Sequence, residues 1–269
     1  GKKKMYELMG DFKNVHVMQL PQNNTDELSF KLWTNEIYKL KRRLEEKFNV
    51  EITDEKLWEA IKIGNQERLG KLNPSPLSGV TMSGTQDAFG FNFDREEKNK
   101  SIVEKTKEIY ELWEKELKGK KTNRPRILIT GCPVGGVREK ILTRIEEAGA
   151  DIVVYENCSG VREKLELIDE TIENPIEAIA KKYLNLSCSV MTPNEKRFKD
   201  LDTLIDEYQV DAVIEIVLQA CHTFAVESTK VKKFVTEKKG KPYMYIESDY
   251  SMTDVGQVST RIEAFLEMI

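Results

Sequence analysis

The sequence predicts an α/β fold with a small, doubly wound, parallel four-stranded sheet in its C-terminal half. Short β-rich runs cover residues 126–130, 151–156, 212–218 and 242–247. Segments with helical periodicity separate them, and this alternation indicates parallel strands joined by right-handed crossovers. The chain before residue 123 shows mainly the three- and four-residue apolar steps of helices, so we expect it to be helix-rich.

The N-terminal part opens with a predicted strand at 14–20, which Pro21 ends. A long helix is predicted over 26–48, because apolar residues recur along one helical face. Asp54 is predicted to cap the helix that follows. The residues that these two helices are expected to turn inward are Leu28, Leu32, Trp33, Ile37, Leu40, Leu44, Phe48, Leu57, Trp58 and Ile61.

Residues 2–9 have the character of a helix end that leads directly into the strand at 14–20. A helix followed by a strand is typical of the second half of a βαβ unit. We therefore expect the natural protein to begin before Gly1 and the N-terminal domain to be incomplete here.

Another helix is predicted over 94–117, and the polar segment 119–123 is the predicted domain boundary. It divides the chain into residues 1–122, the remainder of an N-terminal α/β domain with a helical insert, and residues 123–269, a C-terminal domain. The Pro- and Gly-containing loop 73–85 either lines a pocket or is a plain connection.

The helices of the C-terminal domain carry recognisable start signals. A helix is predicted over 137–148, directly after the first strand. Residues 174–177 read Asn-Pro-Ile-Glu, with an N-cap, proline at the first helical position and glutamate at the third. Residues 192–195 read Thr-Pro-Asn-Glu and repeat that signature. Asp254 is predicted to cap the last helix, whose inner face is Val255, Val258, Ile262, Phe265 and Leu266.

Composition narrows the classes of function. The chain has 269 residues, 39% hydrophobic and 33% charged, as expected of a globular protein with a sizeable core. A net charge of -4 argues against nucleic-acid binding, and no apolar run is long enough for a membrane helix. Four cysteines are too few for a secreted disulfide scaffold, so we expect reduced thiols and a cytoplasmic location.

The positions of the cysteines are more informative than their number. Cys132, Cys158 and Cys221 each follow a predicted strand, and the carboxyl ends of parallel strands form the ligand-binding edge of such a sheet. Cys188 falls between two predicted helices. Thiolates suit zinc, copper(I) or iron–sulfur clusters. The absence of a Cys-x-x-Cys knuckle favours an iron–sulfur site over structural zinc. Four ordinary buried thiols are the alternative.

Other interpretations of the same edge stay open. Residues 131–136 could cradle a phosphate at a helix N-terminus, although they lack the spacing of either common phosphate-binding motif. Cys221 and His222 could form a nucleophile–base pair. Residues 247–249, Glu-Ser-Asp, could position a substrate or simply bond loop backbone.

Four segments resemble one known family. They are 131–135 (Gly-Cys-Pro-Val-Gly), 156–160 (Glu-Asn-Cys-Ser-Gly), 219–222 (Gln-Ala-Cys-His) and 256–265. They are similar to the 2-hydroxyacyl-CoA dehydratase / benzoyl-CoA reductase family, and within it to the double-cubane-cluster branch of anaerobic reductases. The resemblance covers nearly the whole chain.

The resemblance implies two Rossmann-like domains and a cluster held on cysteines. In the double-cubane branch, two 4Fe-4S units share a sulfide and form an 8Fe-9S cluster on six cysteines. Cys132, Cys158, Cys188 and Cys221 match four of these ligands. The other two would lie upstream of Gly1 and are absent, so we expect this chain to be inactive by itself and the cluster to be lost or degraded.

The resemblance also implies a function and partners. It implies an ATP-dependent, low-potential reductase component that receives electrons from an ATP-hydrolysing iron–sulfur activator, acts on a small molecule and forms a homodimer. His222 is a candidate proton donor, and Gln257 and Arg261 are candidate groups beside the cluster. Two alternatives are a 2-hydroxyacyl-CoA dehydratase subunit (a lyase) with one 4Fe-4S cluster, and a non-catalytic electron-transfer or metal-storage protein.

Overall fold

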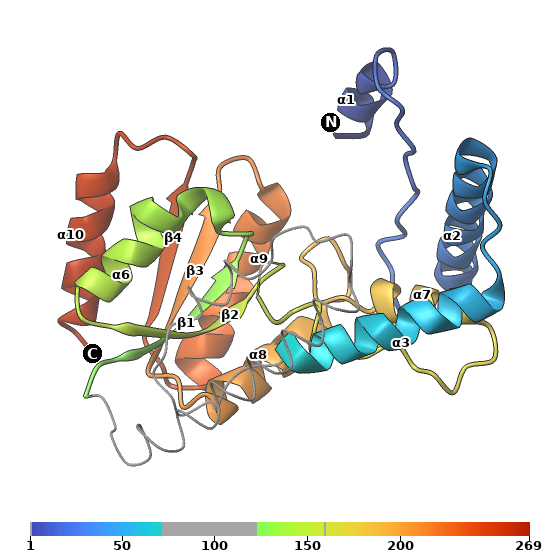
Figure 1. Cartoon of the computed structure of the whole chain (residues 1–269). Coiled ribbons are helices and arrows are strands. Elements are labelled where there is room, and N and C mark those ends of the chain that lie inside the picture. The colour runs from blue at the N-terminus through green and yellow to red at the C-terminus, as the bar shows by residue number, and fades with distance from the viewer. Residues whose placement is uncertain (1, 72–122, 159) are drawn as a thin grey trace. The chain divides into compact units, whose positions relative to one another are not determined.

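The computed structural model describes residues 2–71, 123–158 and 160–269 of the chain (Figure 1). Its contacts divide into two compact units. The first contains Gly1–Gly64, Leu167–Leu186 and Val190–Pro193. The second contains Asn65–Glu166, Ser187–Ser189 and Asn194–Ile269. The predicted boundary at 119–123 falls almost wholly outside the described residues and stays a prediction, as do the loop at 73–85 and the helix at 94–117.

The second unit is built on the predicted parallel sheet. Its strands are β1 (Arg126–Gly131), β2 (Asp151–Glu156), β3 (Ala212–Leu218) and β4 (Tyr243–Ser248). All pairs are parallel and the spatial order is β2-β1-β3-β4. The chain therefore reverses its direction of winding between β1 and β3. The carboxyl ends of strands at such a switch point are the usual ligand site of this architecture.

Helices cover both faces of the sheet, so the predicted doubly wound, Rossmann-like fold is confirmed (Figure 1). One face is covered by η3 (Arg138–Leu142), α6 (Thr143–Glu147) and α10 (Val255–Leu266), through residues such as Ile141, Ile145, Val258 and Ile262. The other face is covered by α8 (Glu195–Glu207), α9 (His222–Lys233) and η4 (Phe234–Lys238).

The helix predicted over 137–148 is present but changes its winding. It begins as the 3-10 turn η2 (Gly135–Val137), continues as the π-helical turn η3 and ends as the short α6. Its apolar residues nevertheless reach the core as predicted, because Val137, Ile141 and Ile145 are all fully buried.

The first unit consists of helices among the described residues. They are α1 (Lys2–Met9), α2 (Glu27–Phe48), the start of α3 (Asp54–Lys71) and α7 (Pro175–Leu184). Asp26 caps α2, because its Oδ1 accepts a hydrogen bond from Leu28 N–H at 3.0 Å. The core of this unit joins α2 and α3 to α7, through Ile37, Ile61, Ile176, Ala178 and Ala180.

Two predictions for the first unit were wrong. Residues 14–20 form no strand, because some of their backbone groups bond side chains of helix α2 instead of another strand. Arg43 donates to Val15 O at 3.3 Å, and Gln19 N–H donates to the Glu36 carboxylate at 2.8 Å. The predicted inner face of α2 is only partly covered. Ile37 is buried, whereas Leu28 and Phe48 are 72% and 60% exposed.

The helix starts of the C-terminal half were predicted with mixed accuracy. Asn174 caps α7 as predicted and accepts from Ile176 N–H and Glu177 N–H at 2.9 and 3.2 Å. Helix α8 begins at Glu195 rather than at Pro193, since Thr192 N–H bonds Gln22 O instead. Asp254 precedes α10 but makes no capping bond. Its carboxylate pairs with Lys140 Nζ at 2.5 Å.

No helix in the described part of the chain is both long enough and apolar enough to cross a membrane.

Candidate functional site

The first thiol sits in a turn that is tied tightly to the neighbouring strand. Gly131 ends β1 with a φ of +106°, and a Cβ at this position would lie 2.2 Å from Ile216 O. The same carbonyl accepts from Cys132 N–H at 2.8 Å. Leu218 N–H in turn donates to Cys132 Sγ at 3.3 Å. Only glycine allows this close approach, which places Cys132 at the carboxyl edge of β3.

Cys132 and Cys221 form a pair at the switch point of the sheet. Cys221 follows β3 through Ala220, whose φ is +65°, and its N–H donates to Leu218 O at 2.9 Å. Its side chain packs in the same apolar cluster as Cys132 and Phe224. Burial, with Cys221 nearby, raises the pKa of the Cys132 thiol to about 12. Binding to a metal centre would therefore release a proton from this thiol.

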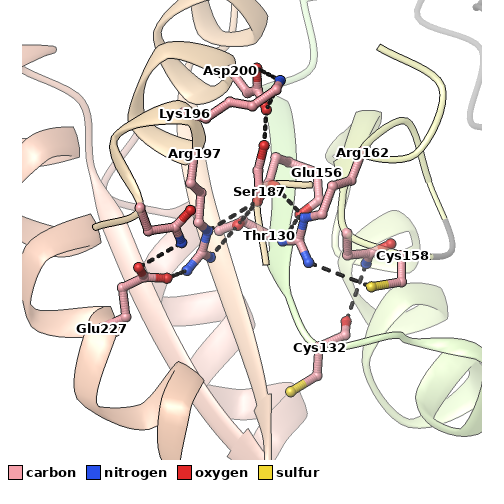
Figure 2. Close-up of polar contacts among 12 residues, drawn as sticks. Thr130, Cys132, Glu156, Cys158, Arg162, Ser187, Lys196, Arg197, Asp200 and Glu227 are labelled. Atoms are coloured by element: carbon pink, nitrogen blue, oxygen red, sulfur yellow. Dashed lines mark hydrogen bonds and ion pairs between the residues drawn. The ribbon is translucent and has the colours of Figure 1, made fainter. Parts of the chain in front are cut away.

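The other two cysteines lie near the guanidinium of Arg162. Arg162 Nη1 approaches Cys158 Sγ at 3.6 Å, within the range of a hydrogen bond to sulfur, and Arg162 is also within electrostatic reach of Cys188. Asn157 Nδ2 donates to Cys132 O at 3.2 Å and so links the turns after β1 and β2. In Figure 2 the sulfur of Cys158 faces the guanidinium of Arg162, whereas the sulfur of Cys132 has no contact drawn to Arg162.

Cys188 is held between two side-chain hydrogen bonds. Ser187 Oγ bonds Asp200 on helix α8. Ser189 Oγ donates to Thr223 Oγ1 at 2.9 Å, in the first turn of α9. The segment 187–189 therefore belongs to the second unit, although the residues on either side of it cluster with the first. All four cysteines thus lie in one compact unit.

A buried network of charged side chains lies beside the cysteine turns (Figure 2). Glu156, at the end of β2, accepts from Arg162 Nε at 2.7 Å and from the Thr130 hydroxyl. Arg197 Nη2 reaches Glu215 at 3.0 Å and Thr130 Oγ1 at 2.9 Å. These four charged side chains are at most 3% exposed.

The pKa values of the two carboxylates of this network, Glu156 and Glu215, shift in opposite directions. Burial alone would raise the pKa of Glu156, but the guanidinium groups of Arg162 and Arg197 outweigh it and lower the pKa below its ordinary value. Burial raises the pKa of Glu215, and Arg197 and the Tyr243 hydroxyl only partly offset this effect. The arginine partners therefore stabilise Glu156 as an anion, whereas burial makes Glu215 easier to protonate than an ordinary glutamate.

Sequence reasoning missed these charged residues, although a signal was present. Glu156 and Glu215 stand within or at the end of strands that are otherwise apolar. A carboxylate in a strand that is covered on both faces requires a buried partner. Searching for the cations that satisfy it would have pointed to Arg162 and Arg197.

The three other predicted site residues lie on exposed helix surfaces. His222 is the first residue of α9 and is exposed. Gln257 is exposed on α10, and Arg261 donates to Tyr245 O at 2.9 Å. None of the hydrogen bonds found in the described part of the chain joins these residues to a cysteine. Their proposed roles therefore rest on sequence resemblance.

A polar cavity of about 210 Å³ opens at the ends of β3 and β4. Lys140, with a side chain 1% exposed, pairs there with Asp249 at 3.2 Å and with Asp254. Residues 247–249, predicted to lie at this edge, all contribute to the wall. The lining consists of Gln219, Glu247, Ser248, Asp249, Thr253 and Asp254.

In the described part of the chain, the thiols do not form a site for a single metal ion. Across the described residues, no three His, Cys, Asp or Glu side chains converge closely enough to hold one metal ion. The cysteines instead form a Cys132–Cys221 pair and a second group around Arg162. Iron–sulfur clusters bind thiolates on different iron atoms, so their ligands need not meet at one point.

Comparison with known proteins agrees with the family that the sequence motifs resemble. The family model described as 2-hydroxyglutaryl-CoA dehydratase, D-component, matches residues 1–269. The chain is 45% identical, over all of its length and 72% of the relative's, to the putative dehydratase subunit YjiM of Escherichia coli (strain K12). It is 26% identical, over 93% of its length and 67% of the relative's, to the (R)-phenyllactyl-CoA dehydratase beta subunit of Clostridium sporogenes. Both relatives belong to the 2-hydroxyacyl-CoA dehydratases, which the sequence motifs also resemble. The chain therefore belongs to the 2-hydroxyglutaryl-CoA dehydratase D-component family.

Proposed function

We propose that this chain is the iron–sulfur component of an ATP-dependent, low-potential reductase within this family. Cys132, Cys158, Cys188 and Cys221 would hold an 8Fe-9S double-cubane cluster. The observation that supports this proposal is the presence of all four thiols in one unit, near the carboxyl edge of the sheet. When bound, such a cluster supplies single electrons at low potential.

The chain's own residues would position the cluster and control its access to water. Gly131 lets Cys132 approach β3, and the bond from Leu218 N–H orients its sulfur. Asn157 keeps the turns after β1 and β2 at a fixed separation. Cys132 is buried and Cys158 is exposed, so one side of the site is dry and the other is open to a partner.

The proposed partners follow from the family resemblance. An ATP-hydrolysing iron–sulfur activator would deliver the electrons, and a small-molecule substrate would accept them. We also propose a homodimer and a cytoplasmic location. All four cysteines are free, as a reducing compartment requires.

A second function, a dehydratase subunit with one 4Fe-4S cluster, has an observation of its own in its favour. A relative that matches 93% of this chain is named as an (R)-phenyllactyl-CoA dehydratase beta subunit. In that case the protein is a lyase acting on a 2-hydroxyacyl-CoA, and a second, different subunit completes it. By the family resemblance, a dehydratase subunit holds its single cluster on three cysteines, of which Cys221 matches one, so Cys132, Cys158 and Cys188 would be additional.

Iron and sulfide content after anaerobic reconstitution separates the two functions. The natural full-length protein is expected to bind about eight irons per chain as the double cubane, against about four for a single cluster. Single Cys132→Ser, Cys158→Ser, Cys188→Ser and Cys221→Ser variants are each expected to lower the iron content. A count near four would favour the dehydratase, and variants that bind as much iron as the parent would remove both proposals.

Substrate turnover provides an independent test. The reconstituted protein, supplied with ATP and an activator from a related system, is expected to oxidise the reduced activator in the presence of a small acceptor. Dehydration of a 2-hydroxyacyl-CoA by the same mixture with a second subunit would instead establish the lyase.

A further inference from the structure

We infer that Arg162 is a positioning residue for the cysteine site, whose guanidinium is held by Glu156 so that one N–H group faces the sulfur of Cys158. This inference rests on the proposed iron–sulfur function. It assigns a role to a residue that no sequence motif singled out.

The orientation of Arg162 is determined by two bonds to a single residue. Its Nε donates to Glu156 Oε1 at 2.7 Å, and its Nη2 donates to the Glu156 backbone carbonyl at 3.1 Å. These bonds occupy one edge of the planar guanidinium. The remaining nitrogen, Nη1, then lies 3.6 Å from Cys158 Sγ, as Figure 2 shows. A planar fork with several donors can make all three contacts together, which a lysine ammonium cannot do in this geometry.

The surroundings keep the guanidinium in place. Arg162 is 3% exposed, and its central carbon lies 5.3 Å from the centre of the Phe224 ring. Phe224 packs in the same apolar cluster as Cys132 and Cys221. One aromatic ring therefore lies beside the arginine of one cysteine group and in the same cluster as both members of the other pair.

The positive charge of Arg162 interacts with two kinds of negative group. Glu156 compensates it on one side, and the negative charge that thiolates carry when they bind metal meets it on the other. Arg162 is also within electrostatic reach of Cys188. Hydrogen bonds to cluster sulfurs, and nearby positive charge, favour the reduced and more negative state and strengthen metal retention. Arg162 is therefore expected to raise the reduction potential of the site and to slow the loss of iron.

Arg197 provides a matched control, because it is an equally buried arginine of the same network. It also lies near Phe224, at 4.9 Å from the ring centre. Its hydrogen bonds and ion pairs go to Thr130, Glu156, Glu215 and Glu227, and none of those found in the described chain reaches a cysteine. A purely structural role for the network would make substitutions at the two arginines equivalent.

The test uses the natural full-length protein, reconstituted anaerobically with iron and sulfide. The variants are Arg162→Gln, Arg162→Lys and, as the control, Arg197→Lys. Iron retention is measured by competition with a chelator, and the midpoint potential by a redox titration followed by electron paramagnetic resonance. Far-UV circular dichroism before reconstitution confirms that each variant is folded.

Arg162→Gln is expected to weaken iron retention about 10- to 100-fold. At a fixed applied potential it is also expected to lower the ratio of reduced to oxidised cluster about tenfold, which is about 59 mV for a one-electron couple. Arg162→Lys keeps the positive charge in the network but loses the planar set of guanidinium donors. Iron retention should therefore still fall, whereas the midpoint potential should shift less than in Arg162→Gln. Arg197→Lys is expected to leave both quantities at the parental values.

Equal iron retention and equal potential in the parent and in Arg162→Lys would overturn the inference, as would equal effects of Arg162→Lys and Arg197→Lys. If Arg162→Gln does not fold, the lysine pair still decides the question. Failure of the parent itself to take up iron and sulfide would refute the proposed function instead, so the two failures are distinguishable.

Discussion

The substitution Gly131→Ala tests whether the turn that carries Cys132 depends on the close approach of β1 to β3. The added Cβ would lie 2.2 Å from Ile216 O and 3.0 Å from Ile216 C, both backbone atoms of a central strand. The φ of +106° is also unfavourable for alanine. The change therefore adds a steric conflict to a conformational cost.

The magnitude follows from these two contributions and from one hydrogen bond. A non-glycine residue in a sparsely populated backbone conformation costs about 1–3 kcal/mol. Overpacking against backbone that cannot move freely adds about 1–3 kcal/mol. Displacing the Ile216 carbonyl also disturbs the 2.8 Å bond from Cys132 N–H, which contributes about 1 kcal/mol. We expect the free energy of unfolding of the second unit to fall by about 3–7 kcal/mol.

Gly149→Ala is the matched control. Gly149 has a φ of +96°, but a Cβ there would meet no atom within 4 Å. It should carry the conformational cost alone, about 1–3 kcal/mol. The difference between the two variants therefore isolates the contact with Ile216.

The assay is unfolding in urea followed by far-UV circular dichroism. In reconstituted protein, Gly131→Ala should also reduce iron uptake, whereas Gly149→Ala should not. Costs that agree within about 0.5 kcal/mol would refute the close-approach argument, since independent substitutions are additive to that level.

Three other predictions concern charges and a cap. Glu156→Gln should destabilise the protein above pH 4.5, the ordinary pKa of a glutamate, because its lowered pKa means that the ionised form is the stabilised one. The difference from the parent, measured as urea midpoints between pH 7 and 3, should vanish as the pH falls through the folded pKa; a constant difference contradicts it. Arg197→Met should cost about 3–5 kcal/mol in urea unfolding at pH 7, because it leaves buried carboxylates unpaired, and a loss under 1 kcal/mol would show that they are not ionised. Asn174→Ala should cost about 1 kcal/mol through the lost cap of α7, seen as a fall in Tm of about 2–4 °C; an unchanged Tm would show that the cap bonds do not stabilise the fold.

Much of the C-terminal fold could be predicted because its signals are local. Strands covered on both faces are mostly apolar, and the runs at 126–130, 151–156 and 212–218 have that character apart from a few charged residues such as Glu156 and Glu215. The carboxyl ends of parallel strands share one edge, so the sequence predicted that Cys132, Cys158 and Cys221 lie along the same edge of the sheet. The cap at Asn174 is equally local.

Tertiary structure decided how the thiols are grouped and which charges support them. Cys132 clusters with Cys221 because its turn bonds Ile216 and Leu218 of β3, the strand that Cys221 follows. Sequence distance contains no information on strand order. Arg197 reaches Glu215 across 18 positions, and Arg162 turns back to Glu156 across six. Such pairs form because a buried carboxylate must find a cation wherever the fold brings one close, a condition that only the assembled chain can satisfy.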